Sequence, residues 1–517
     1  MRTRTWLSLL LALVAPFAFA SPPAAAAAPA DVPGLDAYVQ QVMHDWHVPG
    51  LSIAVVKEGK VLLARGYGVR RLDEPGKVDA DTLFDIGSNT KAFTVAALGT
   101  LVSGGKLQWD TPVVDELKEW RLQDPYVTQR ATLLDLLTHR TGYCDPGAVW
   151  YTSDASDILE RVRYQEPKYG FRTTFCYNNV QYLAAGRFIP AITGGSWNDY
   201  VAAHLLRPLD MDRTVTTDAA VEASGNVAAP HGMVDGSPAA VGRYWPHNMD
   251  AFAAVGGIWS SANDMSHWLQ MLLANGKYAG RHVLDAQVID AMETPRILIQ
   301  SDGIGGEIRR WMPGGHFYTY GLGLFVQDYH GHLLVWHAGD IDGMASAMAL
   351  VPDARLGIVV LSNMDHADAR FAIVARVLQG MLELPTRDIE ATLLAATHKN
   401  DAEGDAIEKK LADTRVAGNA PPLPLADYAG TYTDELDGEA QVAVEHGHLV
   451  LRLGNPDFTG ALTPWHGNTF RVDWRHQFYG DDYVTFDVDA LGRPSKLHLA
   501  GASLHYQRSQ SAAPKPN

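Results

Sequence analysis

The chain has 517 residues, of which 47% are hydrophobic and 20% charged, and its 42 basic and 59 acidic residues give a net charge of −17. This composition excludes disordered, collagen-like and small disulfide-rich proteins, and the length allows two or three domains. Because nucleic acids and anionic membranes are bound through Lys and Arg, the acidic balance argues against both as partners.

The first residues have the pattern of a signal peptide. Arg2 and Arg4 precede an apolar run that ends in a small-residue cleavage site before Ser21. An uncleaved anchor is the alternative, but the run is short for a bilayer span. We therefore expect residues 1–20 to be a signal peptide, residues 21–33 a disordered leader, and the mature protein to be exported without stable membrane insertion.

Residues 34–385 are expected to form one domain with strands at both ends and helices between them. Two β-rich runs, 51–56 and 61–67, predict a hairpin, and four short β-rich runs follow within 322–361. The stretches between them have helical apolar spacing. This order predicts an α+β fold, an antiparallel sheet flanked by helices with a helical subdomain. The Gly-rich stretch 302–315 is expected to be a surface loop, with a lid over the cleft as the alternative.

The last quarter of the chain has a different pattern. Residues 386–424 are rich in Ala and charged residues and end in a Pro-rich run, which predicts a helical connector and a stiff linker. Residues 425–508 alternate apolar and polar residues between Gly-containing turns, so we expect a small antiparallel barrel or sandwich. Residues 509–517 are expected to be a disordered tail.

Ser88 and Lys91 form the sharpest chemical motif. Ser88 begins an expected helix over 90–101, which places Lys91, three residues on, on the same helical face. A serine hydroxyl becomes a nucleophile when a base takes its proton, and a lysine acts as that base when burial lowers its pKa. A helix-capping serine is the alternative. A second match to this spacing, Ser103 and Lys106, follows the helix and predicts a Gly-rich loop.

Two further motifs supply groups that a hydrolase uses. Tyr177 and Asn179 precede an expected helix and offer a phenol for proton transfer and an amide to bind a substrate carbonyl. His337 and Gly339 follow an expected strand, where they would line the other side of a cleft. Taken singly, Tyr177 is also explained as a half-buried aromatic residue, and His337 as an ordinary surface or core imidazole.

In this order the three motifs resemble the active-site signature of the serine β-lactamase and penicillin-binding-protein superfamily. Within it, the chain is similar to class C β-lactamase-related serine hydrolases, which include D-aminopeptidases, D-specific peptidases and esterases. Residues 428–506 resemble the small lipocalin-like domain that follows the hydrolase domain in some of these proteins. Further stretches that support the resemblance over residues 34–385 are 48–51, 136–142, 208–211 and 256–264.

The resemblance implies a β-lactamase/transpeptidase-like fold and a role for each motif residue. Ser88 would be the acylated nucleophile, Lys91 would accept its proton, and Tyr177 would pass a proton to the leaving group and later to water. Asn179 would orient the substrate amide. The backbone N–H groups of Ser88 and Asp340 would form the oxyanion hole, where each donor contributes about 3–4 kcal/mol.

The third motif departs from the family pattern. β-Lactamases of this superfamily have Lys-Thr-Gly, whose lysine and threonine hold the antibiotic carboxylate, whereas this chain has His337-Ala338-Gly339. Because a neutral imidazole and a methyl group offer less to a carboxylate, we expect no efficient β-lactamase activity. One hypothesis pairs Asp340 or Asp342 with the α-amine of a substrate, and the alternative is two exposed turn carboxylates.

The two cysteines, Cys144 and Cys176, either form a disulfide or stay as two free thiols, and the sequence leaves both open. Cys176 directly precedes Tyr177. A bridge to Cys144 would therefore brace the loop that carries Tyr177 and Asn179.

The sequence thus predicts an exported serine hydrolase, periplasmic or secreted, that cleaves amide or peptide bonds, including those of D-amino-acid peptides, through a Ser88 acyl-enzyme. The alternatives are an esterase or weak class C-like β-lactamase and, outside enzymes, a penicillin-binding sensor or cell-wall-peptide-binding protein. Neither a metal nor an organic cofactor is expected, because the chain has no metal-binding or phosphate-binding motif and residues 365–368 predict a polar loop. The expected partner is a small-molecule or peptide substrate, and no pattern sets the oligomeric state.

Overall fold

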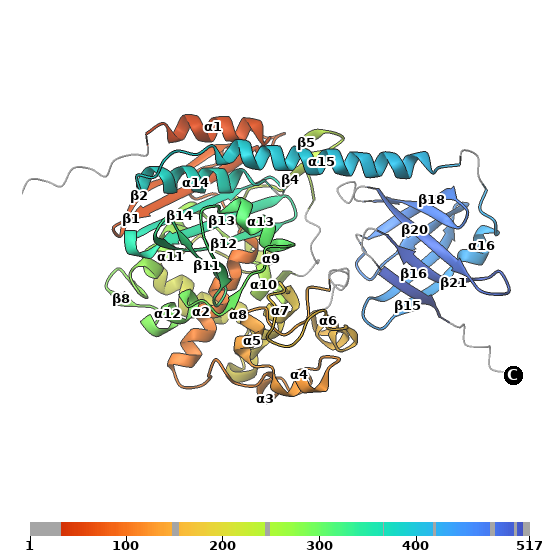
Figure 1. Cartoon of the computed structure of the whole chain (residues 1–517), viewed down its shortest axis with the longest axis horizontal. Helices are drawn as coiled ribbons and strands as arrows, with labels where there is room; N and C mark the ends of the chain where they lie inside the picture. Colours follow the sequence, from red (N-terminus) through yellow and green to blue (C-terminus); the bar gives the residue numbers. More distant parts are fainter. Residues whose placement is uncertain are drawn as a thin grey trace, which may run out of the picture.

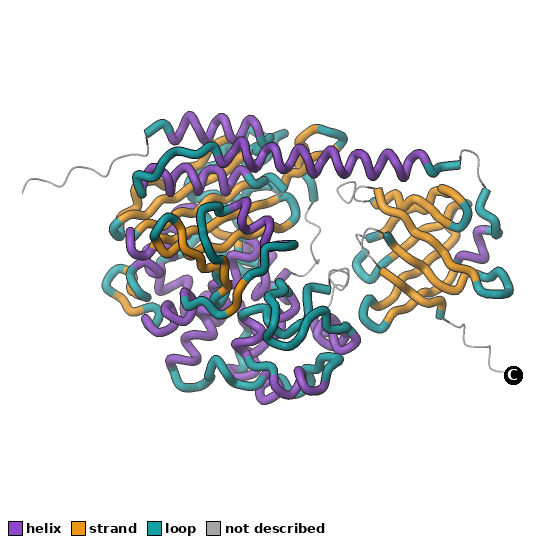
Figure 2. The backbone as a smooth tube through the Cα atoms, viewed as in Figure 1, coloured by secondary structure: helices purple, strands orange, loops and turns teal. Residues whose placement is uncertain are grey.

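The computed structural model describes residues 33–146, 155–242, 249–365, 367–416, 420–456, 458–475, 481–500 and 504–509. The expected signal peptide lies outside the described residues, and so do all of the expected leader except its last residue and all of the expected tail except its first. The described chain forms a larger part, with a sheet between helices, and a smaller β-barrel (Figure 1). Figure 2 shows one long helix leading from the larger part to the barrel.

An eight-stranded antiparallel sheet is the centre of the larger part, as predicted, and it is built from both ends of this part of the chain. The expected hairpin forms its first two strands, and the late β-rich runs lie beside them. The strands in sheet order are β2 (Lys60–Gly68), β1 (Gly50–Lys57), β14 (Leu356–Ser362), β13 (Met344–Val351), β12 (His332–Ile341), β11 (Phe325–Tyr329), β10 (Tyr318–Tyr320) and β9 (Ile297–Leu298).

Helices cover both faces of this sheet, which explains the continuous apolar runs of its central strands. In β14, Ile358 and Val360 pack into one core cluster, whereas Val359 and Leu361 pack into a second cluster on the opposite face. The first cluster includes side chains of α1 (Leu35–Asp45) and α14 (Ala369–Met381), and the second includes those of α2 (Thr90–Ser103), α11 (Ala262–Leu273) and α12 (Ala286–Glu293).

The remaining helices of the larger part form the predicted helical subdomain, which packs around α2 on the second face of the sheet (Figure 1). None of the described helices has the length and apolar character needed to cross a bilayer. The helices of the helical subdomain are α3 (Val113–Glu116), α4 (Pro125–Arg130), α5 (Leu133–Leu137), α6 (Ala155–Arg161), α7 (Asn179–Thr193), α8 (Trp197–Val201), α9 (Asp218–Ala223) and α10 (Ala253–Gly256). Three short strand pairs join β3 (Phe84–Asp85) to β6 (Trp259–Ser260), β4 (His231–Val234) to β5 (Ser237–Ala240), and β7 (Lys277–Tyr278) to β8 (Arg281–His282).

The expected surface loop over 302–315 is wrong, because this stretch contains α13 (Ile304–Trp311). Its glycines disfavour a helix in isolation, but tertiary packing overrides them. Ile308 is buried, and the Trp311 ring stacks on Phe371 of α14 with the ring centroids 4.9 Å apart. Ile308 and Trp311 are three positions apart, which places both side chains on one face of the helix.

The C-terminal strands close into an eight-stranded antiparallel barrel, which decides between the two expected architectures. Each strand pairs with the next, and the first pairs with the last around a core of aromatic and aliphatic side chains. The strands are β15 (Gly430–Asp434), β16 (Gly438–Glu445), β17 (His448–Arg452), β18 (Thr459–His466), β19 (Thr469–Trp474), β20 (Asp481–Val488), β21 (Pro494–Leu499) and β22 (Leu504–Arg508). Before the barrel lie α15 (Ile389–Asp413) and the short α16 (Leu425–Tyr428).

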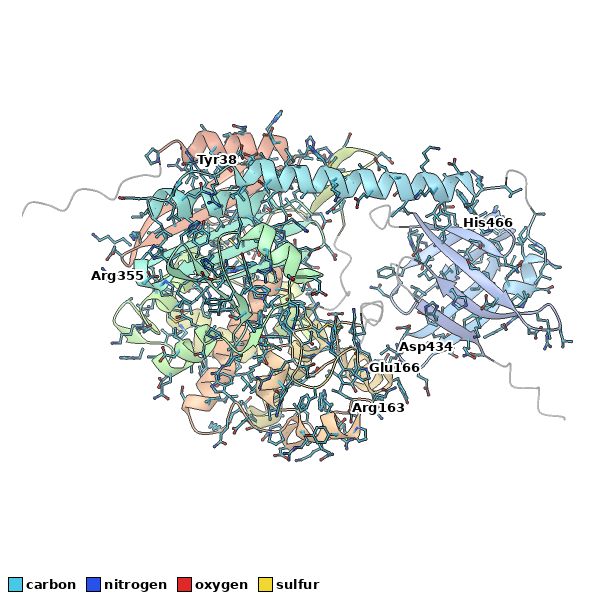
Figure 3. The ribbon with its side chains drawn as sticks, viewed as in Figure 1. Tyr38, Arg163, Glu166, Arg355, Asp434 and His466 are labelled. Carbon is cyan, nitrogen blue, oxygen red and sulfur yellow. A yellow bond between two sulfur atoms is a disulfide. The ribbon has the colours of Figure 1, made fainter. Side chains whose placement is uncertain are left out.

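The turn between β15 and β16 brings the barrel against α6 of the larger part. Leu436 packs against the hydrophobic cluster to which α6 contributes, and an added Cβ at Gly438 would overlap the guanidinium of Arg161. Figure 3 shows Asp434, in β15, on the side of the barrel that faces Arg163. The barrel therefore contacts the helical subdomain as well as the linking helix.

Cys144 and Cys176 form a disulfide with their Cα atoms 5.0 Å apart. The bridge closes a loop between residues 32 positions apart, joining the segment after α5 to the segment before α7. Closing such a loop lowers the conformational entropy of the unfolded chain, which stabilises the folded state by about 3–4 kcal/mol.

The double substitution Cys144→Ala and Cys176→Ala is therefore expected to lower the free energy of unfolding by about 3–4 kcal/mol. Urea denaturation followed by tryptophan fluorescence measures this change. A thiol reductant should lower the denaturation midpoint of the wild type and leave that of the double variant unchanged. Equal midpoints for the two oxidised proteins would contradict the stabilising role of the bridge.

Candidate active site

Ser88 lies in the short 3₁₀ turn Gly87–Asn89 that leads into α2. Its side chain is partly exposed, whereas the residues on either side are buried. Gly87 has φ +50°, a conformation that glycine adopts without strain, and an added Cβ there would lie 2.9 Å from the backbone nitrogen of Asp340. The glycine thus allows the turn that presents Ser88 to pack directly against the end of β12.

Lys91, in the first turn of α2, is fully buried and directed at Ser88. Its Nζ lies 2.8 Å from Ser88 Oγ, 2.8 Å from Asn179 Oδ1 and 3.0 Å from the carbonyl oxygen of Val255. None of these three partners is a carboxylate. Burial lowers the pKa of the Lys91 amine from 10.5 to about 7, although the charge of Asp145 acts in the opposite direction. Near neutral pH the amine can therefore lose its proton and accept one from Ser88.

Tyr177 also reaches Ser88, because its side chain is hydrogen-bonded to that of Ser88. The Nζ of Lys91 lies 5.0 Å from the centre of the Tyr177 ring. Burial raises the pKa of the phenol, the Ser88 hydrogen bond lowers it, and the charges of Asp145 and Asp340 raise it further. The phenol therefore stays protonated at neutral pH and can donate a proton to a group bound at Ser88.

Asn178 and Asn179 tie the Tyr177 segment to the start of α7. The Asn178 side chain caps the helix by accepting from the backbone N–H of Gln181, and it donates to the carbonyl oxygens of Tyr143 and Cys144. The backbone N–H of Asn179 donates to Asp145 at 2.8 Å, while its side-chain oxygen accepts from the Lys91 amine. Tyr177 and Asn179 are therefore separated by one residue, Asn178, which caps α7, while Asn179 reaches Lys91.

The third motif lies on β12, with His337 buried and Gly339 at the turn that carries Ser88. The His337 Nδ1 donates to the carbonyl oxygen of Ala338 at 2.6 Å, so its Nε2 accepts from the Tyr320 hydroxyl at 3.0 Å. Burial and the charge of Lys91 lower the pKa of His337 to about 3, so this imidazole is neutral. An added Cβ at Gly339 would overlap the carbonyl oxygen of Ile86, which explains the need for glycine there.

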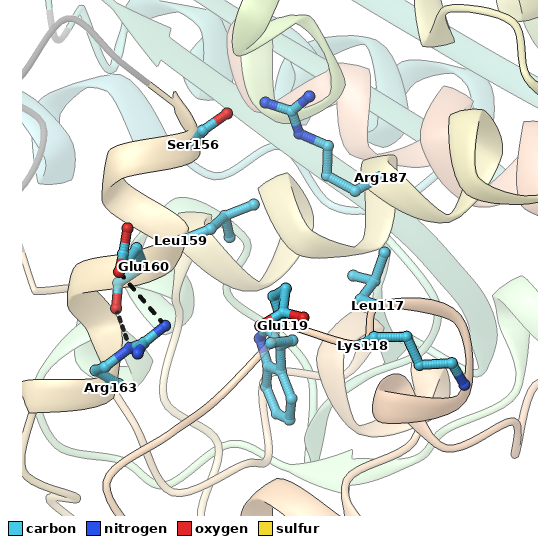
Figure 4. A pocket seen from close by; sticks show the side chains of 9 residues that line it. Leu117, Lys118, Glu119, Ser156, Leu159, Glu160, Arg163 and Arg187 are labelled. Atoms are coloured by element: carbon cyan, nitrogen blue, oxygen red, sulfur yellow. Dashed lines mark hydrogen bonds and ion pairs between the residues drawn. The ribbon is translucent and has the colours of Figure 1, made fainter.

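Three of the predicted site residues, Ser88, Asn179 and Asp340, line one small cavity of about 50 Å³. The lining of this cavity also includes apolar residues, among them Phe252 and Val255. Ser88 and Asp340, whose backbone N–H groups the resemblance implies for an oxyanion hole, both line this cavity. A separate cavity of about 570 Å³ is lined by residues of α6, α7 and the segment 117–120, Arg187 among them, and by none of the predicted site residues (Figure 4).

Several groups at the site were not predicted from the sequence. His139 is buried with its ring 4.4 Å from that of Tyr177, and its Nδ1 accepts from the backbone N–H of Asn178. Burial and the charge of Lys91 hold the pKa of His139 well below its usual value, so it supports Tyr177 as a neutral ring. The stretch 136–142 contains this histidine, but nothing in its pattern shows which ring it supports.

Two carboxylates near the site have arginine partners that join distant segments. Asp135, at the start of α5, accepts from Arg140 and from Arg172 at 2.7 Å each, which fixes the chain just before the Tyr177 segment. Asp340 accepts two hydrogen bonds from Arg370 of α14. Among the described residues, no group of three or more His, Cys, Asp and Glu side chains is arranged to hold a metal ion.

The comparisons with known proteins agree with this geometry. The Beta-lactamase family matches residues 35–380, more than half of the chain, and a domain of unknown function, DUF3471, matches residues 414–512. The unguisins hydrolase ungD' of Aspergillus campestris is 29% identical over 419 residues, which are 76% of this chain and 74% of that protein. Protein flp of Staphylococcus aureus strain MW2 is 25% identical over 341 residues, 64% of this chain and 63% of flp.

Two solved structures show the same fold. The octameric penicillin-binding protein homologue from Pyrococcus abyssi has a TM-score of 0.58 and 22% identity, covering 92% of this chain and 99% of its own. A class C beta lactamase from Rhodobacter sphaeroides has a TM-score of 0.55 and 22% identity, covering 68% of this chain and 99% of its own. From the family match and these likenesses, the chain belongs to the beta-lactamase family of serine hydrolases.

Proposed function

We propose that this protein is an exported hydrolase that cleaves amide or peptide bonds through an acyl-enzyme on Ser88. The observation that supports it most strongly is the 2.8 Å contact between the fully buried Lys91 amine and Ser88 Oγ. A lysine that serves only structure is normally exposed or paired with a carboxylate. Here the partners are a hydroxyl, an amide oxygen and a backbone carbonyl.

The reaction is a nucleophilic acyl transfer. Neutral Lys91 takes the proton of Ser88 as Oγ attacks the substrate carbonyl, and the backbone N–H groups of Ser88 and Asp340 stabilise the negative oxygen. The tetrahedral intermediate collapses as the C–N bond breaks. The leaving amine takes a proton through the Tyr177 hydroxyl, which regains one from the Lys91 ammonium. Water then attacks the ester by the same proton path in reverse, which frees Ser88.

The substrate class is proposed from the relatives and from the third motif. A relative of this chain is named a hydrolase of unguisins, and the resemblance to D-aminopeptidases favours peptides that contain D-amino acids. His337 is neutral and buried against Tyr320, so it offers no cation to a substrate carboxylate. This supports peptides and amides over β-lactam antibiotics. Export is proposed from the signal-peptide pattern of residues 1–20.

Covalent labelling tests the nucleophile. A fluorophosphonate should add once to the wild-type protein in an intact-mass measurement, and the Ser88→Ala variant should lose this labelling, because the reacting hydroxyl is gone. Ser103→Ala is the matched control: Ser103 has the same spacing to a lysine, Lys106, but both residues are exposed at the end of α2. Labelling that persists in Ser88→Ala would overturn the assignment.

Turnover separates an enzyme from a sensor. On a panel of chromogenic D- and L-aminoacyl anilides, short acyl esters and a cephalosporin, we expect release of the chromophore from anilides at a rate that Ser88→Ala reduces at least about 10³-fold. Intact-mass spectra taken over time should show an acyl adduct that forms and disappears. An adduct that persists, with no turnover of any substrate, would contradict an enzyme and support a sensor.

The pH dependence of acylation tests the role of Lys91. Because the amine must be neutral to accept the Ser88 proton and its pKa is about 7, the labelling rate should rise with pH and reach half its plateau near pH 7. The charge of Asp145 raises the pKa of Lys91, so Asp145→Asn should move this midpoint to lower pH. Exposed Asp110→Asn is the control and should leave it unchanged. A rate that does not change with pH around this midpoint would exclude Lys91 as the base.

A further inference from the structure

Asp340 lines the same cavity as Ser88, so its carboxylate lies close to any substrate bound there. It directly follows Gly339 of the third motif, and its backbone nitrogen approaches Gly87 in the turn that presents Ser88. Its carboxylate is partly exposed, at 28%, and the residue lines the cavity beside Ser88 and Asn179. The charge of Asp340 reaches the centre of the site, since it contributes to the raised pKa of Tyr177.

The Asp340 carboxylate is paired with Arg370, which does not line the cavity. The guanidinium, in the first turn of α14, donates to both oxygens of Asp340 at 2.6 and 2.8 Å and is only 1% exposed. Its other carboxylate neighbour, Asp368, lies 3.9 Å away, and its Nε is buried with no partner among the described residues. The bidentate hydrogen bonds therefore direct the guanidinium of Arg370 toward Asp340 and not into the cavity.

Among the described residues that line the cavity there is no Lys or Arg, and the guanidinium that pairs with Asp340 lies outside this lining. Lys91 is buried with its amine bound to Ser88 and Asn179, and Asp145 adds a second negative charge that also raises the pKa of Tyr177. The lining also includes apolar residues such as Phe252. A substrate carboxylate on the β12 side would therefore face a like charge, whereas an uncharged group would meet no such repulsion.

We infer that the Asp340–Arg370 pair acts as a charge filter: the Asp340 carboxylate disfavours acyl donors that carry a carboxylate beside the scissile bond. Asp340 also occupies the Arg370 guanidinium, which would otherwise be able to bind such a carboxylate. This inference rests on the proposed function of Ser88. It narrows the substrates to peptides, amides or esters that carry no carboxylate next to β12, such as those with an internal, blocked or amidated residue there.

Matched boronic acids test the filter without knowledge of the natural substrate. Boron forms a reversible bond to Ser88 Oγ, whose proton passes to Lys91, so each compound protects Ser88 from the fluorophosphonate. The pairs are 3-carboxyphenylboronic and 3-carbamoylphenylboronic acid, and the corresponding 4-substituted acids, which differ only in one charge. We expect the wild type to bind the carbamoyl member of at least one pair about 10-fold or more tightly than the carboxylate.

Two variants separate charge from packing. In Asp340→Asn, which keeps the shape of the side chain, Arg370 loses its counter-charge, so the preference should reverse toward the carboxylate. In the double variant Asp340→Asn with Arg370→Met both charges are gone, and the two members should bind about equally. Thermal unfolding reports whether each variant is folded, and a general loss of packing would weaken both members of a pair alike, leaving their ratio unchanged.

The outcomes distinguish this inference from the proposed function. If no boronic acid protects Ser88, the nucleophile assignment fails. If both members protect Ser88 equally well in the wild type, or if folded Asp340→Asn keeps the wild-type ratio, the nucleophile stands and the charge filter is overturned. If Asp340→Asn does not fold, the wild-type protein is measured at low and high salt. Salt screens a like-charge repulsion, so the ratio of the affinities for the carbamoyl and carboxylate members should fall as the salt concentration rises. A ratio that does not change with salt would overturn the charge filter.

Discussion

The contact between the Lys91 amine and the Ser88 hydroxyl is the constraint on which the rest of the site depends. A lysine without a carboxylate partner is costly to bury while charged, so the surrounding structure must supply polar oxygen atoms and exclude water. The Asn179 side chain and the Val255 carbonyl supply these oxygen atoms, and the helices packed around α2 exclude water. The same burial that disfavours the charged amine would let Lys91 act as the proposed base at neutral pH.

Each segment that reaches this lysine is held by a contact from elsewhere in the chain. Gly87 and Gly339 let the α2 turn and β12 approach each other, and the disulfide and the Asp135 ion pairs fix the segment that carries Tyr177. Arg370 fixes the end of β12 from the other face of the sheet. The groups that we propose to act in catalysis come from three distant stretches, and these contacts hold each stretch in place.

Local patterns predicted the elements and the motifs, but not the partners that folding brings to them. The hairpin of β1 and β2, the helix after Ser88 and the C-terminal β-structure all follow from apolar periodicity and turn residues. Arg370 and Asp145 have no sequence signal, because their roles come from contacts across 30 and 34 residues. The sequence does not decide whether Cys144 and Cys176 are bonded, because the bond depends on a Cα separation of 5.0 Å that only the tertiary structure sets. The helix α13 was missed because Ile308 and Trp311 stabilise it through distant packing partners.

The protonation state of Lys91 is the most direct test of this account. NMR titration of protein labelled with ¹³C at the lysine side chains would follow each amine separately, and the signal missing from Lys91→Met identifies the one that matters. We predict that this signal titrates near pH 7, because burial lowers its pKa to about that value. A titration near 10.5, the ordinary value for lysine, would show that the amine is charged at neutral pH and would contradict the mechanism.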